Sequence, residues 1–226
     1  MSPVARFLEQ KDVLGMGIRM RESVKLSKIS LGLKLIFIGI LLRMFSVIAL
    51  LIPYGAILTL TAIYAEAILM LAGLWIAGKR DRRYHNVLCV YVLYYFYGQA
   101  EELLAEFLVS DVASFLYIIG KSLLEVWLVY LLCHTTEKLL LEQEEKGIAK
   151  MGKIVYLFYF IRMVFNIIYG VFSWFFTVPA ILEIVILPLG LCYMVVQVIY
   201  IVFLGRSFSF LKRRAEKLEQ KEVAEI

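Results

Sequence analysis

Nine glutamate, lysine and arginine side chains lie inside long apolar stretches of this sequence. A charge near the centre of a bilayer costs about 2.5–3.5 kcal/mol on insertion scales, and such residues usually face other helices or a water-filled cavity. The acids outnumber the bases, so pairing within the group leaves at least three carboxylates that need a proton, water or a cation. The bases are Arg43, Lys121 and Arg162, and the acids are Glu66, Glu101, Glu102, Glu106, Glu125 and Glu183.

Two ion pairs are predicted near the middle of the membrane. At about 1.5 Å per residue, Arg43 and Glu66 reach similar depths on consecutive helices, so they can meet. Lys121 and Glu125 are four residues apart on one helix, a spacing that places both side chains on the same face. Such pairs can simply hold helices together, as can close packing of small residues such as Gly73 and Ala77.

Further polar residues extend this pattern toward the outer face of the membrane. Arg162 lies at the middle depth and shares one face of its helix with Asn166. Glu102 and Glu106, which share a helix face, lie nearer the outer side, as do Glu101 and Glu183. The surplus of acids on this side predicts an acid-rich polar cavity that opens to the outside. The predicted solute- or ion-binding residues are Arg43, Glu66, Glu102, Glu106, Lys121, Glu125, Arg162, Asn166 and Glu183.

Cysteine and histidine residues form a second group, at the inner ends of two neighbouring helices. Cysteine and histidine ligands suit zinc, and a cysteine beside a histidine suits nucleophilic catalysis. Their spacing matches no known metal motif, so we predict no metal and no cofactor and keep the four as weak candidates only. They are His85, Cys89, Cys133 and His134.

The elements that position these residues are predicted from the distribution of apolar residues. Hydrophobic residues make up 62% of the 226-residue chain and charged residues 19%, against roughly 45–50% and about 25% in soluble domains. Three apolar blocks, 35–78, 84–133 and 154–205, are each long enough for two crossings of about 20 residues. We therefore predict an all-α polytopic integral membrane protein, a bundle of six transmembrane helices built from three helical hairpins. The predicted helices are 35–52, 56–78, 85–109, 112–133, 154–177 and 179–205, the last interrupted near Pro188.

The basic residues predict how the chain is threaded. All but three of the 24 Lys and Arg residues lie outside the apolar blocks, in four segments that share one side only if there are six crossings. Cytoplasmic segments collect Lys and Arg, so both termini are predicted to be cytoplasmic, in a multi-pass protein of the plasma (inner) membrane. No cleavable signal peptide is expected. Residues 1–34 are expected to lie on the membrane surface or to be partly disordered, residues 35–205 to form the membrane domain, and residues 206–226 to form a cytoplasmic helical tail.

Transport is the function that this pattern favours: the protein would move, or help to move, a solute or ion across the membrane. Its partners would be the lipid bilayer and either further copies of the chain or a larger membrane complex, and no nucleic acid. One alternative is a non-catalytic sensor or scaffold that binds a partner through its cytoplasmic tail. Another is an intramembrane enzyme that uses the cysteine and histidine residues, although the sequence favours a protein that is not an enzyme.

Overall fold

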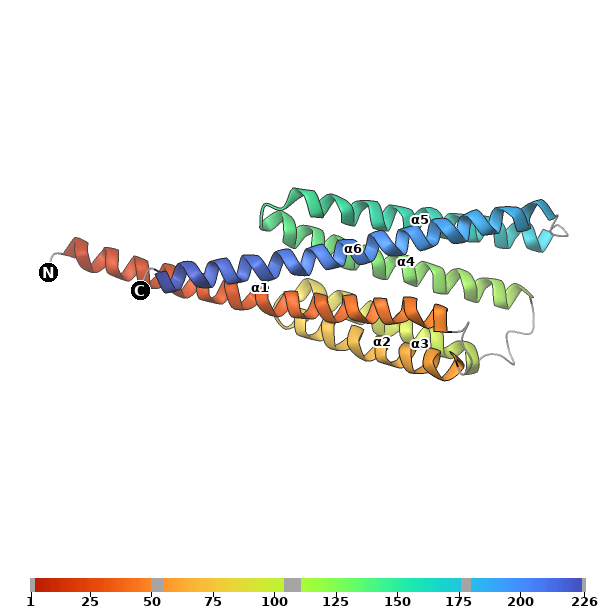
Figure 1. Cartoon of the computed structure of the whole chain (residues 1–226), viewed down its shortest axis with the longest axis horizontal. Coiled ribbons are helices and arrows are strands. Elements are labelled where there is room, and N and C mark those ends of the chain that lie inside the picture. Colours follow the sequence, from red (N-terminus) through yellow and green to blue (C-terminus); the bar gives the residue numbers. More distant parts are fainter. Residues whose placement is uncertain (1–2, 50–54, 104–110, 176–179, 225–226) are drawn as a thin grey trace.

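Long helices make up almost all of the chain that the structure, a computed structural model, describes: residues 3–49, 55–103, 111–175 and 180–224 (Figure 1). No strand occurs within these ranges. The all-α prediction is therefore confirmed. The helices are α1 (Pro3–Ala49), α2 (Gly55–Gly78), α3 (Arg82–Leu103), α4 (Asp111–Glu142), α5 (Lys146–Phe175) and α6 (Ala180–Ala224).

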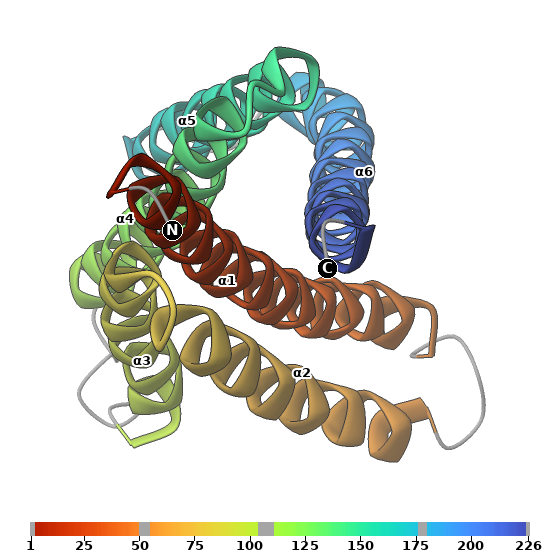
Figure 2. The same ribbon diagram turned by 90° about the vertical axis from the view of Figure 1, so that its left-hand side faces the viewer.

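The helices form a ring in chain order. Each helix packs against the next, and α6 closes the ring by packing against α1 (Figure 2). Both chain ends lie at the same end of the bundle as the α2–α3 and α4–α5 turns (Figure 1). This is the arrangement expected of three helical hairpins. Below, we call this end of the bundle the terminal end.

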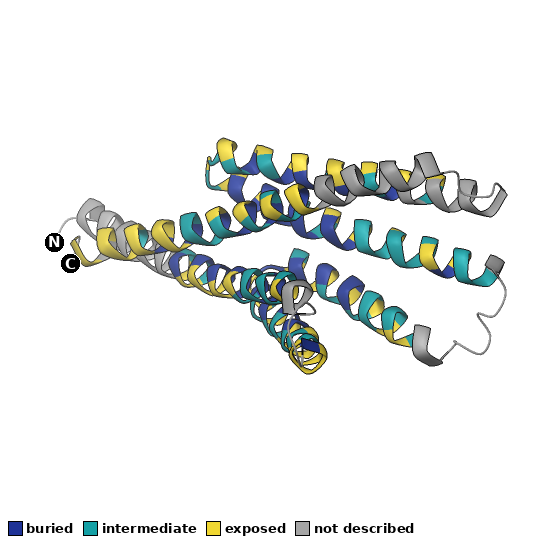
Figure 3. Ribbon diagram, turned by 45° about the vertical axis from the view of Figure 1, so that its right-hand side comes forward, coloured by how far each residue is buried: buried dark blue, intermediate teal, exposed yellow. Residues whose placement is uncertain are grey.

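Buried residues gather on the inward faces of the helices (Figure 3), and many of the exposed residues are large and apolar. Within the described residues, three segments are long and apolar enough to cross a membrane: Gly55–Gly78, Ala113–Glu142 and Met194–Lys221. Large apolar side chains such as Ile68 and Phe96 are about two-thirds exposed. Exposed apolar surface on this scale indicates a membrane protein.

Helix α1 begins much earlier than the sequence predicts. The helix runs unbroken from Pro3, and Leu26, Ile29 and Leu33 are buried in the core. Their spacing of three and four residues produces an apolar stripe on one face of the helix, although charged residues surround it in sequence. The Ser30 hydroxyl donates a hydrogen bond of 2.8 Å to the carbonyl of Phe208 on α6. Residues 21–34 are thus part of the helical bundle rather than a separate surface segment.

Two other helix ends also differ from prediction. Helix α4 continues to Glu142 and α5 begins at Lys146, so the predicted loop at 134–153 is reduced to the turn at 143–145. Helix α6 extends to Ala224, as the helical tail predicted. The predicted interruption near Pro188 is absent, because the helical backbone continues through it. Proline is tolerated in membrane helices where neighbouring groups satisfy the freed carbonyl.

Small residues bring α1 and α2 unusually close together. A Cβ atom added to Gly32 would lie 2.5 Å from the carbonyl oxygen of Gly73 and 3.0 Å from the Cβ of Ala77. Neither glycine has room for a side chain, so the two backbones are nearly in contact. The predicted small-residue packing at Gly73 and Ala77 is confirmed. It fixes the register of α1 against α2, on which the central charged residues depend.

Candidate functional site

The first central ion pair joins α1 to α2. Arg43 Nη1 donates a hydrogen bond of 3.3 Å to Glu66 Oε1, and Arg43 Nη2 lies 3.5 Å from the hydroxyl of Tyr94 on α3. Gly39, one turn before Arg43, packs close to the Glu66 backbone, where an added Cβ would be 3.3 Å from the carbonyl oxygen. The Glu66 side chain is 10% exposed and that of Arg43 49%. The predicted pair is confirmed, with its carboxylate buried and its guanidinium half-exposed.

The second central pair differs from the predicted one. Glu125 Oε1 accepts a hydrogen bond of 3.2 Å from Arg162 Nη1 on α5, across the α4–α5 contact. The sequence predicted Lys121 as the partner of Glu125, on the same helix. The ammonium of Lys121 instead lies 5.8 Å from the centre of the Tyr117 ring, within range of a cation–π contact.

Two tyrosines fix α3 against α4 beside Lys121. The rings of Tyr97 and Tyr117 stack with their centres 4.8 Å apart. Each hydroxyl donates to a backbone carbonyl of the other residue, at 3.3 Å from Tyr97 and 2.7 Å from Tyr117. Gly120 leaves the space that the Tyr97 hydroxyl occupies. The position of Lys121 therefore follows from a rigid contact between helices.

Two cavities adjoin the Arg43–Glu66 pair. The larger, about 260 Å³, lies among α1, α2, α3 and α4, and the smaller, about 50 Å³, is lined by residues of all six helices. Arg43, Glu66, Tyr91 and Tyr94 line both. We call the larger one the central cavity. Its other polar lining groups are Tyr95, Gln99 and Lys121.

The lining of the central cavity combines charges of both signs with neutral hydrogen-bonding groups. Arg43 and Lys121 are cationic and Glu66 is anionic, while tyrosine hydroxyls and the Gln99 amide can donate and accept. Such a lining can satisfy the polar groups of a small solute that has left water. The arrangement is suited to binding.

Four predicted site residues lie outside what the structure describes at the level of side chains. They carry most of the predicted acid surplus on the outer side, which therefore stays a prediction. These residues are Glu102, Glu106, Asn166 and Glu183.

The smaller cavity contains residues that the sequence analysis missed. Tyr159, Gln197 and Tyr200 line it from α5 and α6, and the rings of the two tyrosines meet edge to face at 5.9 Å. Gln197 and Tyr200 are three residues apart, a spacing that puts two polar groups on one face of an apolar helix. That spacing is a signal that could have identified them.

Three of the four cysteine and histidine candidates lie in different surroundings. Cys133 is fully buried, Cys89 is exposed, and His134 stacks on Tyr130 with ring centres 5.3 Å apart. Among the described residues, no group of three His, Cys, Asp or Glu side chains could hold a metal ion.

A separate charged network, absent from the predicted site, joins the helices at the terminal end. The Arg83 guanidinium binds both oxygens of Asp81, at 2.6–3.1 Å, and both oxygens of Glu142, at 2.7 and 3.0 Å. The Asp81 carboxylate also accepts from the Arg83 backbone amide at 3.0 Å, which caps the start of α3. Burial alone would raise the pKa of Asp81, but the hydrogen bonds and charge of Arg83, with the charge of Lys25, lower it below its usual value.

The fold and the central cavity thus define a class: an all-α membrane protein with a polar site among its helices. Comparison with protein-family models, with curated proteins and with solved structures finds no match to this chain.

Proposed function

We propose that the chain crosses the membrane six times, with both termini on the cytoplasmic side. Three helices have the length and composition of membrane spans, and all six run side by side in one bundle (Figure 1). The basic segments, including the one at 79–83 and the tail after Arg206, lie at the terminal end (Figure 1). Cytoplasmic segments of membrane proteins are rich in Lys and Arg, so this end is proposed to be the cytoplasmic one.

Within that topology, the protein binds a small polar solute or ion in the central cavity and moves it, or helps to move it, across the membrane. The observation that carries this proposal is a cavity of about 260 Å³ beside an ion pair whose carboxylate is buried, among helices with apolar outer faces. A buried ion pair is often no more stabilising than a well-packed apolar contact. A pair that served only to hold helices together would be better enclosed than placed beside a cavity.

The position of the Arg43–Glu66 pair suggests how a solute would proceed. The pair lines both the central cavity and the smaller cavity that leads to Glu125 on α4. A solute in the central cavity would exchange its hydration for contacts with Arg43, Glu66 and Tyr94. Passage toward α5 and α6 would require the pair to separate, so the solute's own charges would have to replace the lost contact.

The test is whether the central cavity contains water that is continuous with one side of the membrane. In full-length protein whose native cysteines have been replaced, Gly98→Cys places a thiol in the lining, and Ile68→Cys places one on the exposed apolar face. Both variants are reconstituted in liposomes and treated with a membrane-impermeant maleimide. We expect rapid labelling of Gly98→Cys from one side only and none of Ile68→Cys.

Equal protection of both thiols from either side would overturn the proposal, because it would show a dry interior. Leu74→Cys, at a fully buried position of α2, gives the rate expected for a thiol inside packed protein. A matched Glu66→Gln background then tests the role of the ion pair. Weakening the pair should increase labelling at Gly98→Cys, since the cavity would open toward the smaller one.

A further inference from the structure

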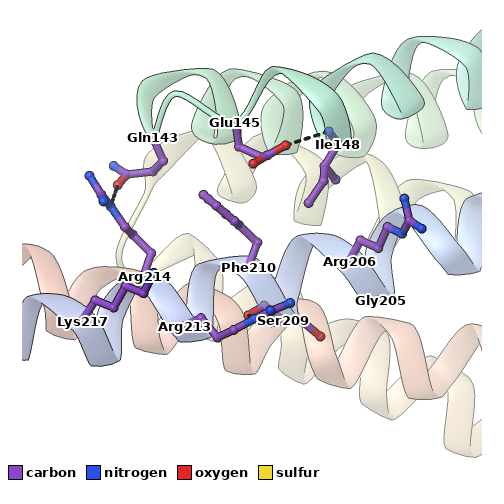
Figure 4. Close-up of a pocket in the computed structure, with 10 residues that line it drawn as sticks. All are labelled: Gln143, Glu145, Ile148, Gly205, Arg206, Ser209, Phe210, Arg213, Arg214 and Lys217. Carbon is purple, nitrogen blue, oxygen red and sulfur yellow. Dashed lines mark hydrogen bonds between the residues drawn. The ribbon is translucent and has the colours of Figure 1, made fainter.

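A third cavity lies at the terminal end, well apart from the central one. It has a volume of about 630 Å³ and separates α6 from the α4–α5 turn (Figure 4). We call it the basic groove, because four cationic side chains of α6 line it: Arg206, Arg213, Arg214 and Lys217.

The four cations share one side of α6. Arg213, Arg214 and Lys217 follow Arg206 by seven, eight and eleven residues. These spacings correspond to about two to three helical turns, so the four side chains leave the helix on about the same side. Phe210 lies between them in sequence, and its ring projects from α6 toward the α4–α5 turn in Figure 4. The groove therefore combines a cationic edge, formed by the four basic residues of α6, with the aromatic ring of Phe210.

The contacts of these cations are with neutral groups. Arg213 Nε donates to the carbonyl of Ser209 at 3.3 Å, and Arg214 Nε donates to Gln143 Oε1 at 3.4 Å. Across the described part of the chain, none of the four forms an ion pair with a carboxylate within 4 Å. Lys212, on another side of the same helix, does pair with Glu216, at 3.6 Å. The cationic edge of the groove is thus left for an external anion.

The opposite wall of the groove is held rigidly. Glu144 adopts a left-handed backbone with φ of 64°, and the amide of Glu145 donates back to the carbonyl of Leu140 at 2.9 Å, which ends α4. The Glu145 carboxylate accepts from the amides of Gly147 and Ile148, both at 3.2 Å, and so caps α5. The one acidic group in the lining is therefore engaged by the backbone.

We propose that the basic groove binds the phosphate of an anionic phospholipid of the cytoplasmic leaflet. A guanidinium can donate two parallel hydrogen bonds to phosphate oxygens, a contact that each arginine of the groove can supply. The apolar stretch of α6 ends at Gly205 and the basic residues begin at Arg206, the depth at which headgroups lie. The apolar side chains of Phe210 and Ile148 give acyl or glycerol carbons a contact that inorganic phosphate would not need.

The test compares two double variants of the full-length protein that remove equal charge. Arg213→Gln with Lys217→Gln removes two groove cations and keeps the Arg214–Gln143 contact. Lys212→Gln with Lys221→Gln removes two cations that do not line the groove. Binding is measured in detergent by titrating phosphatidylglycerol, phosphatidylcholine or inorganic phosphate and following the thermal unfolding temperature.

We expect phosphatidylglycerol, and not phosphatidylcholine, to raise the unfolding temperature of the wild type. The groove variant should bind phosphatidylglycerol at least tenfold more weakly, while the control variant binds it as the wild type does. Unfolding at the wild-type temperature in phosphatidylcholine alone shows that a variant is folded. Equal weakening in both variants would overturn the proposal in favour of general charge attraction. Stabilisation by inorganic phosphate at the same concentrations would overturn the lipid assignment in favour of a soluble phosphate compound.

Discussion

Acidic and basic side chains pair between helices in two regions of this protein, and the two regions differ in how completely they do so. At the terminal end, Arg83 makes two-pronged contacts with both Asp81 and Glu142, at 2.6–3.1 Å. At the centre, Arg43 meets Glu66 through one hydrogen bond of 3.3 Å, and a cavity adjoins the pair.

The difference separates two uses of the same chemistry. Bidentate contacts on the Arg83 guanidinium fix its geometry and hold α2, α3 and α4 in place. A single longer contact beside a cavity leaves room for the partners to move and for a third group to enter. The terminal-end network therefore serves as structural support, and the centre is where binding is expected.

Substitution of Gly73 by leucine should have the largest effect, because the centre depends on the close approach of α1 and α2. Even a Cβ at this position would lie 2.5 Å from the carbonyl oxygen of Gly32 and 2.8 Å from Ile36 Cγ1. We expect a loss at or above the upper end of the about 1–3 kcal/mol typical of overpacking. The measurement is thermal unfolding of the purified protein in detergent. Gly98→Ala is the control, since a Cβ there meets nothing within 4 Å; an equal loss in both variants would contradict the prediction.

Neutralising one acid in each region should show that the two ion pairs differ in how much stability depends on them. Glu66→Gln leaves Arg43 without its buried carboxylate and should cost about 1–3 kcal/mol. Glu142→Gln, at a side chain that is 52% exposed, should cost about 1 kcal/mol or less. Both are measured by thermal unfolding under the same conditions. Adding Arg43→Gln to Glu66→Gln should restore part of the loss, because no uncompensated charge remains. Equal costs at the two sites would remove the distinction between them.

The terminal-end network should show a specific dependence on pH through Asp81. Because the folded-state pKa of Asp81 is lowered, its contribution to stability is full above the unfolded pKa of about 3.9 and is lost as the pH falls through the lower folded value. The wild type should therefore lose more stability than Asp81→Asn between pH 5 and pH 3. A difference of about 2–4 °C in unfolding temperature corresponds to 1 kcal/mol for a chain of this size. Parallel losses in the two proteins would show that Asp81 is not the group responsible.

The α4–α5 turn should gain stability from glycine at position 144. Glu144 has a φ of 64°, a conformation that costs a residue with a side chain about 1–2 kcal/mol and glycine little. Glu144→Gly should raise the free energy of unfolding by about 0.5–1 kcal/mol after the entropy that glycine adds to the unfolded chain. Lys146→Gly, at a helical position, should lower it by a similar amount. A loss of stability on Glu144→Gly would mean that the Glu144 side chain has a role of its own.

The local sequence was sufficient to predict the hairpin arrangement, whereas the ends of several helices depend on packing between helices. The lengths of the apolar blocks and the residues at their turns indicate three hairpins from the sequence alone. The ends of α4 and α5 could not be predicted in this way, because residues 134–153 are rich in charge. Leu139, Leu140 and Ala149 are nevertheless buried there, and such burial depends on neighbouring helices rather than on local composition.

The central site shows the same limit. Depth along the helices was sufficient to predict that Arg43 meets Glu66. Depth could not decide between Lys121 and Arg162 as the partner of Glu125, since both lie at a suitable height. That choice depends on how α4 and α5 are turned toward each other. The sequence did not single out Tyr94, because a single tyrosine in an apolar helix is compatible with packing against neighbours, facing lipid or lining a cavity.

The unbroken length of α1 has a mechanical consequence. The helix carries Glu22, which accepts a hydrogen bond of 3.1 Å from Gln143 beside the basic groove, and also Arg43 at the centre. The two residues are about 32 Å apart along one rod, at 1.5 Å per residue. Because the helix is continuous, a rotation or axial shift of one end would move the other end by a similar amount. If the two proposed sites bind a lipid and a solute, the lipid composition of one leaflet would in this way adjust how readily the interior admits the solute.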